Sequence, residues 1–197
     1  MENLLPFLSF LQRFVAITEA EFKQLILPHI EVRRFNKRAI IIRGGDVETY
    51  QNYVLSGLVR KYYSKNGDDF ITQIAKEGHI INVQESFFSG TPSDFCLEAL
   101  EPTVLVSMNR QNLDNIFESN AKMERLGRLV VTFIMVVKDE WQMKMIHLSP
   151  RERFLDFVKK NSELVQRVPQ KYLASYLNIQ PETFSRFKHL LRERRSV

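Results

Sequence analysis

The sequence predicts an α+β protein, in which an N-terminal antiparallel β-roll of the jelly-roll type with short flanking helices is followed by a long helix and a C-terminal helical domain. Three observations support this. Short β-rich runs separated by turn residues fill residues 31–108, residues 120–147 contain no proline, and the positive charge is concentrated in the last quarter of the chain. A chain of 197 residues, 44% apolar and 26% charged, is typical of globular proteins and too short for a multi-domain enzyme.

The first thirty residues are expected to be helical. Apolar residues recur there at helical spacing, at Leu4, Leu5, Leu8, Leu11 and Phe14. Thr18 followed by Glu21 is a capping box that opens a second short helix, which we expect to run through Leu27 and to end at Pro28.

From Glu31 the pattern changes to short strands. The expected strands are 39–42, 50–55, 58–63, 70–75, 80–83, 95–100 and 104–108. The strongest hairpin signal between them is Asn66-Gly67, because both residues accept positive φ. About seven strands of this length make a small roll.

After Met108 the helical period returns, with a short helix over 110–117 and a long one over 120–147. The long helix has an apolar stripe with steps of three and four residues, which is typical of a dimerisation seam; its residues are Met123, Leu126, Val130, Phe133, Val137 and Trp141. The alternative is that this stripe packs on the roll of its own chain. The sequence therefore predicts three segments: 1–119, the long helix 120–148, and 149–197, which begins at the N-cap and first-turn pair Ser149-Pro150.

The net charge of +5 is unevenly distributed. Residues 149–197 contain 11 Lys/Arg against 5 Asp/Glu, so this segment carries +6 and the rest of the chain −1. Such an end suits a polyanionic partner. The single cysteine, Cys96, fits a reducing compartment, and no signal peptide or membrane span is recognisable, so we expect a cytoplasmic protein without a membrane partner.

Residues 170–191 have the pattern of a helix-turn-helix. Leu173, Leu177, Ile179, Phe184, Phe187 and Leu191 occupy the positions of its buried side. Ala174 is small where the helices must cross, and Asn178 stands where the chain must turn through a left-handed conformation. Pro181 suits the first position of the second helix.

If the phenylalanines point inward, the opposite face of the second helix is polar and can enter a major groove. Arg186 could then pair with guanine and Glu182 with a cytosine amino group, while Thr183, Lys171 and Lys188 suit phosphates. The full set of predicted DNA-contacting residues is Gln170, Lys171, Gln180, Glu182, Thr183, Ser185, Arg186, Lys188 and His189. A helical hairpin with a solvated face would show a similar pattern.

A β-roll, a long helix and a C-terminal helix-turn-helix together resemble the Crp/Fnr family of bacterial transcription regulators over nearly the whole chain. Residues 182–186, Glu-Thr-Phe-Ser-Arg, look like the Glu-Thr-Val-x-Arg core of the family's DNA-reading motif. The resemblance implies base-reading roles for Glu182 and Arg186. The Gly44-Gly45-Asp46 turn and residues 54–59 are similar to the family's cyclic-nucleotide-binding roll, so that the predicted roll is of that domain type and residues 1–119 would be a sensor domain.

The sequence departs from this family in two places. Residues 82–86 lack the Gly-Glu pair that holds a ribose, and Ser93-Asp94 stand where an Arg-Ser pair would hold a phosphate, so a response to cyclic AMP is not expected. Candidate contacts for another ligand are Asn82, Gln84, Glu85, Ser93 and Asp94. The second departure follows Leu191, where little or no wing remains; the arginines there either contact phosphates or complement the helix dipole.

An enzyme is not predicted. His29, His79, His147 and His189 are scattered over different elements, no nucleophile elbow occurs, and haem ligation would rest on a single histidine, so no catalytic residue, metal ion or cofactor is expected. The predicted function is a homodimeric, sequence-specific transcription regulator. Its expected partners are a palindromic operator in double-stranded DNA, RNA polymerase and an effector that the sequence does not identify. The alternative is a ligand- or partner-sensing module that does not bind DNA.

Overall fold

The computed structural model describes residues 3–193, except for the side chains of Ser119 and residues 190–193. The chain forms two compact units. The first comprises the residues up to Tyr63 and Gln73–Met135, and the second comprises Ser64–Thr72 and the chain from Val136. The division thus falls inside the long helix, before the boundary at Ser149 that the sequence suggests.

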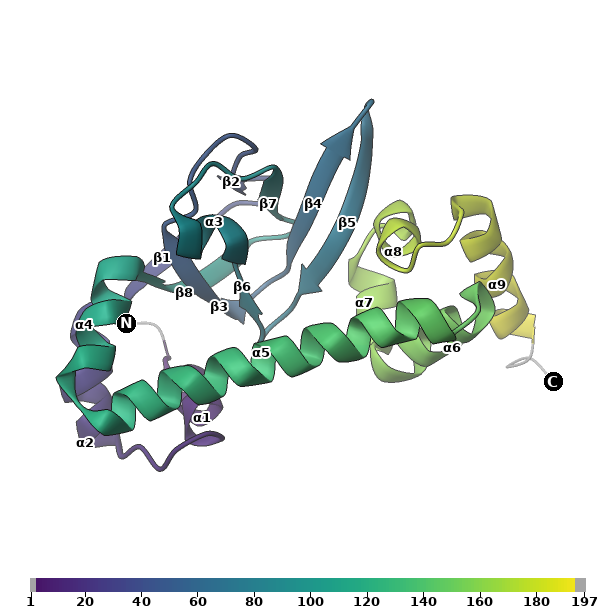
Figure 1. Cartoon of the computed structure of the whole chain (residues 1–197). Coiled ribbons are helices and arrows are strands. Elements are labelled where there is room, and N and C mark those ends of the chain that lie inside the picture. The colour runs from purple at the N-terminus through teal and green to yellow at the C-terminus, as the bar shows by residue number, and fades with distance from the viewer. Residues whose placement is uncertain (1–2, 194–197) are drawn as a thin grey trace. The chain divides into compact units, whose positions relative to one another are not determined.

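The roll consists of two four-stranded sheets (Figure 1). The first has the order β1-β8-β3-β6, with bounds Glu31–Phe35, Thr103–Asn109, Tyr50–Ser56 and Ile80–Ile81. The second has the order β2-β7-β4-β5, with bounds Ile40–Ile42, Phe95–Ala99, Val59–Lys65 and Asp68–Ala75. Pairing is antiparallel, for example Asn52 opposite Ser107 and Lys61 opposite Leu97. The predicted α+β fold and its roll are confirmed.

All seven predicted strands are present, and the Asn66-Gly67 turn joins β4 to β5 with φ values of 54° and 87°. Two elements of the roll were not predicted. Strand β1 pairs with β8 although two of its five residues are arginines, and helix α3 (Gln84–Ser89) follows β6 and ends at Gly90, which has a φ of 71°. Short segments of this kind leave little periodic signal in a sequence.

Gly57 permits the tight turn between β3 and β4. Its φ is +95°, and a Cβ there would lie 2.6 Å from the carbonyl oxygen of Pro102 and 2.7 Å from the Cα of Thr103. Both neighbours are backbone, which cannot move aside without disturbing β8.

Gly57→Ala is therefore expected to lower the free energy of unfolding by about 3 kcal/mol, from the positive φ and the overlap together. Urea unfolding followed by circular dichroism measures this loss. Gly45→Ala is the matched control, because Gly45 has a φ of +94° but nothing within 4 Å of the added Cβ. Equal losses for the two variants would contradict the role of the overlap.

The first unit has two apolar cores. One fills the roll between the sheets and contains Val54, Val59, Leu97 and Leu105, which are fully buried. The other lies on the first sheet, where Tyr53 and Val106 contact the N-terminal helices, α4 and α5. This second core attaches the helices to the roll.

The N-terminal segment forms α1 (Leu5–Gln12), α2 (Glu19–Glu21), a π-helical turn η1 (Phe22–Ile26) and a 3₁₀ turn η2 (Leu27–His29). The Thr18–Glu21 capping box is confirmed, and Lys122 pairs with Glu21 at 2.5 Å and lowers the pKa of its carboxyl to about 2. Pro28 does not stop a regular helix as expected but lies within η2. The backbone has already left α-helical geometry at Phe22.

Helices α4 (Arg110–Ser119) and α5 (Ala121–His147) follow β8. Most residues of the predicted dimerisation stripe of α5 pack within their own chain. Met123 and Leu126 are 0% and 6% exposed in the second core, and Val130 packs beside them. The ring centroids of Phe133 and Phe14 lie 5.5 Å apart. Val130, Phe133 and Trp141 are half-buried, and Val137 is 46% exposed.

The opposite side of α5 carries a second set of apolar residues. At 100° per residue they lie about 110–170° around the helix from the centre of the buried stripe. We call them the outer stripe: Val131, Met135, Val136, Met143 and Ile146, which are 38–67% exposed. No helix within residues 3–193 is long and apolar enough to cross a membrane.

The second unit continues with four helices: α6 (Pro150–Lys160), α7 (Ser162–Arg167), α8 (Gln170–Tyr176) and α9 (Pro181–Glu193) (Figure 1). Ser149 is confirmed as the N-cap of α6, since its hydroxyl accepts from the N–H of Glu152 while the Glu152 carboxylate accepts from the Ser149 N–H. Helix α7 was not predicted.

Candidate functional site

Helices α8 and α9 form the predicted helix-turn-helix on a buried aromatic and aliphatic core. Leu173, Ala174 and Phe184 are fully buried, and the ring of Phe184 meets that of Phe154 edge-on at 5.1 Å. Phe187 contacts the same Phe154 ring at 5.5 Å. Leu191 lies outside the residues whose side chains are described. The inward-pointing phenylalanines hold α9 with its polar side outward.

The turn between the two helices has the expected geometry. Asn178 has a φ of 52°, the left-handed conformation predicted for it. The N–H of Ile179 then donates to the carbonyl of Ala174 at 2.9 Å, and Pro181 is the first residue of α9. This closed turn sets the direction in which α9 leaves α8.

Arg153 secures this turn from inside the unit, and sequence reasoning missed it. Its side chain is buried, and its guanidinium donates to four carbonyls: those of Leu177 at 2.9 Å, Asn178 at 3.0 Å, Leu148 at 2.8 Å and Met145 at 3.3 Å. The carbonyls belong to the end of α5 and the end of α8. A cation at two helix ends also complements their dipoles.

Two further contacts anchor α8. Trp141 of α5 stacks on Tyr176 with ring centroids 4.2 Å apart, and burial raises the pKa of Tyr176 above its ordinary value. Ser175 donates its hydroxyl to the carbonyl of Asp69 at 2.9 Å and accepts from the N–H of Ile71 at 3.0 Å. Trp141, predicted to face a partner chain, therefore contacts its own chain.

The outward side of α9 carries the predicted polar residues. Glu182, Ser185, Arg186 and His189 are exposed, and Thr183 and Lys188 are half-buried. Gln170, Lys171 and Gln180 are exposed as well. The structure brings Gln170 at the start of α8 next to Ser185, Lys188 and His189, and these four line one surface hollow of about 210 Å³.

The cations on this side are available to a partner. Among the side chains of residues 3–189, neither Arg186 nor Lys188 forms an ion pair, whereas Lys144 and Lys160 both pair with Asp156, at 3.0 Å and 2.5 Å. The hydrogen bond from Lys160 is the main reason why the pKa of Asp156 lies below its ordinary value. Asp156 thus pairs with lysines of α5 and α6 and not with Arg186 or Lys188 of α9.

The five candidate ligand contacts of the roll differ in burial and in hydrogen bonding. Asn82 is buried and donates to Gln51 at 2.6 Å, and Ser93 is buried and donates to the carbonyl of Phe95. Glu85 and Asp94 are exposed, and Gln84 lines a cavity next to α5. Asn82 and Ser93 therefore serve the roll's own hydrogen bonding.

Sequence reasoning also missed Lys61 of β4. It is buried on the side of its strand that carries Val59, its ammonium lies 4.4 Å from the ring centroid of Phe95, and it pairs with Glu85 at 3.5 Å. A lysine on a strand is ordinarily expected to face solvent, so nothing in the sequence marks it. The cation inside this end of the roll already has a carboxylate partner.

Comparison with known proteins agrees with this architecture. Residues 32–120 match the model of the cyclic nucleotide-binding domain. A comparison with curated protein sequences found no significant match.

Solved structures match over both units. FixK2 from Bradyrhizobium japonicum is 18% identical, with a TM-score of 0.70, and the alignment covers 84% of this chain and 85% of that one. The c-di-GMP responsive global regulator CLP of Xanthomonas campestris is 17% identical, with a TM-score of 0.67 and coverage of 89% and 92%. A putative transcriptional regulator of the Crp/Fnr family from Eubacterium rectale is 14% identical, with a TM-score of 0.65 and coverage of 90% and 85%. Residues 32–120 are therefore a cyclic nucleotide-binding domain, and the chain has the fold of the Crp/Fnr transcription regulators.

Proposed function

We propose that the protein is a homodimeric, sequence-specific DNA-binding transcription regulator of the Crp/Fnr type rather than an enzyme. The observation that carries this is the outward side of α9, where exposed Arg186 and half-buried Lys188 have no ion-pair partner among the described side chains of residues 3–189. A helix that presents unpaired cations and short polar side chains suits the major groove. The net charge of +6 on residues 149–197 adds the electrostatic attraction to phosphates.

Dimerisation is assigned to the outer stripe of α5. The solvent-facing side of a helix is ordinarily polar. This helix of 27 residues carries five exposed apolar residues on one side, which is typical of an interaction surface. Two such helices packed in parallel related by a two-fold axis would present two copies of α9 to a palindromic site, with half-sites about 34 Å apart.

Cyclic AMP is not the proposed effector. Lys61 is held by Glu85, and Asp94 is exposed where a phosphate would need a cation. A phosphate at this end of the roll would meet two carboxylates and one lysine that already has a partner, so its binding would gain little.

Arg186→Ala is expected to weaken binding to the specific operator by about 1–3 kcal/mol and to relax the preference at one base position, because Arg186 would lose its bidentate bond to guanine. Lys171→Ala is expected to weaken specific and random DNA alike, since it would lose a phosphate contact. Gel shifts on an operator selected from a random DNA pool, and on random duplex of the same length, measure both changes.

In the same gel shifts, cyclic AMP is expected to leave the affinity of the wild-type protein for the operator unchanged.

Lys37→Ala is the control, because Lys37 is an exposed cation of the first unit. It should change neither affinity by more than about twofold. Equal losses on operator and random duplex for Arg186→Ala would contradict the base-reading role, and a wild-type protein that selects no sequence from the pool would contradict DNA reading as a whole.

A further inference from the structure

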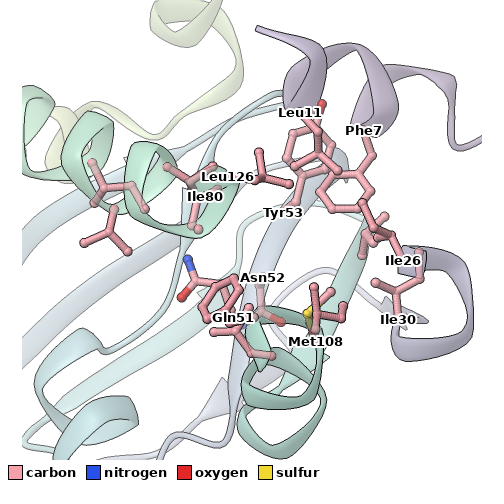
Figure 2. A pocket seen from close by; sticks show the side chains of 18 of the residues that line it. Phe7, Leu11, Ile26, Ile30, Gln51, Asn52, Tyr53, Ile80, Met108 and Leu126 are labelled. Atoms are coloured by element: carbon pink, nitrogen blue, oxygen red, sulfur yellow. The ribbon is translucent and has the colours of Figure 1, made fainter. Parts of the chain in front are cut away.

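The first unit contains an apolar cavity that lies outside the roll interior, between the first sheet and the helices that cover it. Its volume is about 130 Å³. Figure 2 shows Phe7 and Leu11 of α1 on one side and Gln51 and Asn52 of β3 on another, with Leu126 of α5 on a third. Phe88 of α3 lines the same cavity and is 49% exposed, so the cavity has a side open toward solvent.

The polar side chains that line this cavity are the Tyr53 hydroxyl and three amides, those of Gln51, Asn52 and Gln84. The Tyr53 hydroxyl donates to the carbonyl of Pro6. Both ends of the Asn52 amide have partners within the chain, since its oxygen accepts from Ser107 at 2.7 Å and its nitrogen donates to the carbonyl of Tyr50. Gln51 accepts from Asn82 at 2.6 Å, but its amide nitrogen donates to no group within residues 3–193. Since no buried side-chain polar atom of the described residues lacks a partner, this nitrogen is accessible.

We propose that this cavity binds a small, uncharged, largely apolar molecule with one hydrogen-bond acceptor, and that this molecule is the effector of the regulator. An apolar cavity of about 150 Å³ stays dry and binds benzene. The cavity here, of about 130 Å³, is of similar size and fits one aromatic ring, with a substituent at the side that is open toward solvent. None of the lining residues is charged, which excludes an ionic ligand on desolvation grounds. The Gln51 amide nitrogen supplies the one directional contact.

The effector role rests on the proposed function and on the walls that α5 gives to the cavity. Leu126, Gly127, Val130, Val131 and Ile134 of α5 line it, and Val131 also belongs to the outer stripe. Gly127 brings α4 close, since a Cβ there would lie 2.3 Å from the ring of Phe117, which also lines the cavity. An occupant would therefore press on α5 and α4 together, and a shift of α5 would change how two outer stripes meet.

The binding test uses the full chain and three probes of similar size: benzene, benzonitrile, which has an acceptor, and benzoate, which is charged. Ligand-observed NMR on wild-type protein is expected to show binding of benzene and benzonitrile and none of benzoate. Val130→Phe fills the cavity and should abolish the binding of both benzene and benzonitrile. Val106→Leu on β8 is a second variant that fills the cavity with a smaller side chain. Val47→Phe is the matched control, because Val47 is exposed and away from the cavity.

Gln51→Glu tests the polar contact, since it keeps an acceptor for Asn82 and removes the donor. Benzonitrile should bind about tenfold more weakly to this variant, whereas benzene should change by less than about twofold. Absence of benzene and benzonitrile binding to wild type, or binding that persists in both filling variants, would overturn the site.

The effector role is tested by gel shift on the selected operator. Benzonitrile is expected to change the wild-type DNA affinity at least fivefold and to leave that of Val130→Phe unchanged. Probe binding without any change in DNA affinity overturns the effector role. A protein that binds the probes but no DNA in any condition contradicts the proposed function instead, because the NMR measurement contains no DNA.

Discussion

Replacing Arg153 with methionine is expected to lower the free energy of unfolding of the second unit by about 3 kcal/mol or more. Methionine is similar in length and apolar, so it fills the buried space without leaving a large cavity. It cannot donate to the four carbonyls that the guanidinium satisfies at the ends of α5 and α8. Each charged hydrogen bond contributes about 1.5–3 kcal/mol, and buried carbonyls left without a donor are costly.

Urea unfolding monitored by circular dichroism measures the loss, with Arg151→Met on the same helix as the control. Arg151 is exposed, so its replacement should change stability by less than about 0.5 kcal/mol. Arg153→Lys should fall between the two, because one ammonium keeps the charge but cannot span carbonyls on two helices. If Arg153→Met and Arg151→Met unfold at the same urea concentration, the carbonyl cluster does not hold the turn.

Met135→Glu is expected to convert the dimer into monomers and to weaken operator binding by a factor of about a hundred or more. Met135 is 62% exposed and belongs to neither apolar core, so a carboxylate there leaves the cores of the chain intact. In a two-fold dimer it would be desolvated opposite its own copy. The loss of DNA affinity follows because two linked half-site contacts gain an effective-concentration factor of 10²–10⁴, which a monomer lacks.

Sedimentation velocity and gel shifts on one palindromic operator measure the two effects. Leu5→Glu is the matched control, since Leu5 is an exposed leucine of α1, outside α5. Phe133→Glu is expected to behave differently from both, by unfolding the N-terminal helices whose rings at Phe10 and Phe14 it contacts. A Met135→Glu protein that still sediments as a dimer would place the interface away from the outer stripe.

Local pattern predicted most of the fold. Strands bounded by turn residues and the Asn178 turn depend on neighbouring residues, so they can be recognised in a sequence. Strand β1 was not predicted, because Arg33 and Arg34 interrupt its apolar pattern and its pairing with β8 is a long-range contact. The apolar stripe of α5 was recognised, but periodicity shows only that one side of a helix is covered and not whether the cover is its own chain or a partner.

The candidate site was predicted where it depends on one helix and missed where it depends on distant residues. The exposed residues of α9 follow from helical spacing once Phe184 is placed inward. Arg153 gives no such signal, because its four acceptors are backbone carbonyls between Met145 and Asn178. Likewise, the accessible amide of Gln51 is a feature of the cavity and not of the sequence around it.

The stack of Trp141 on Tyr176 makes the state of the second unit visible to spectroscopy. Trp141 is the only tryptophan of the chain, so all indole emission comes from this one position. The phenol face that covers the indole belongs to α8, the first helix of the helix-turn-helix. Any event that moves α8 away from α5 would expose the indole to water and shift its emission to the red. The protein thus carries an intrinsic optical reporter at the joint between its long helix and its recognition motif.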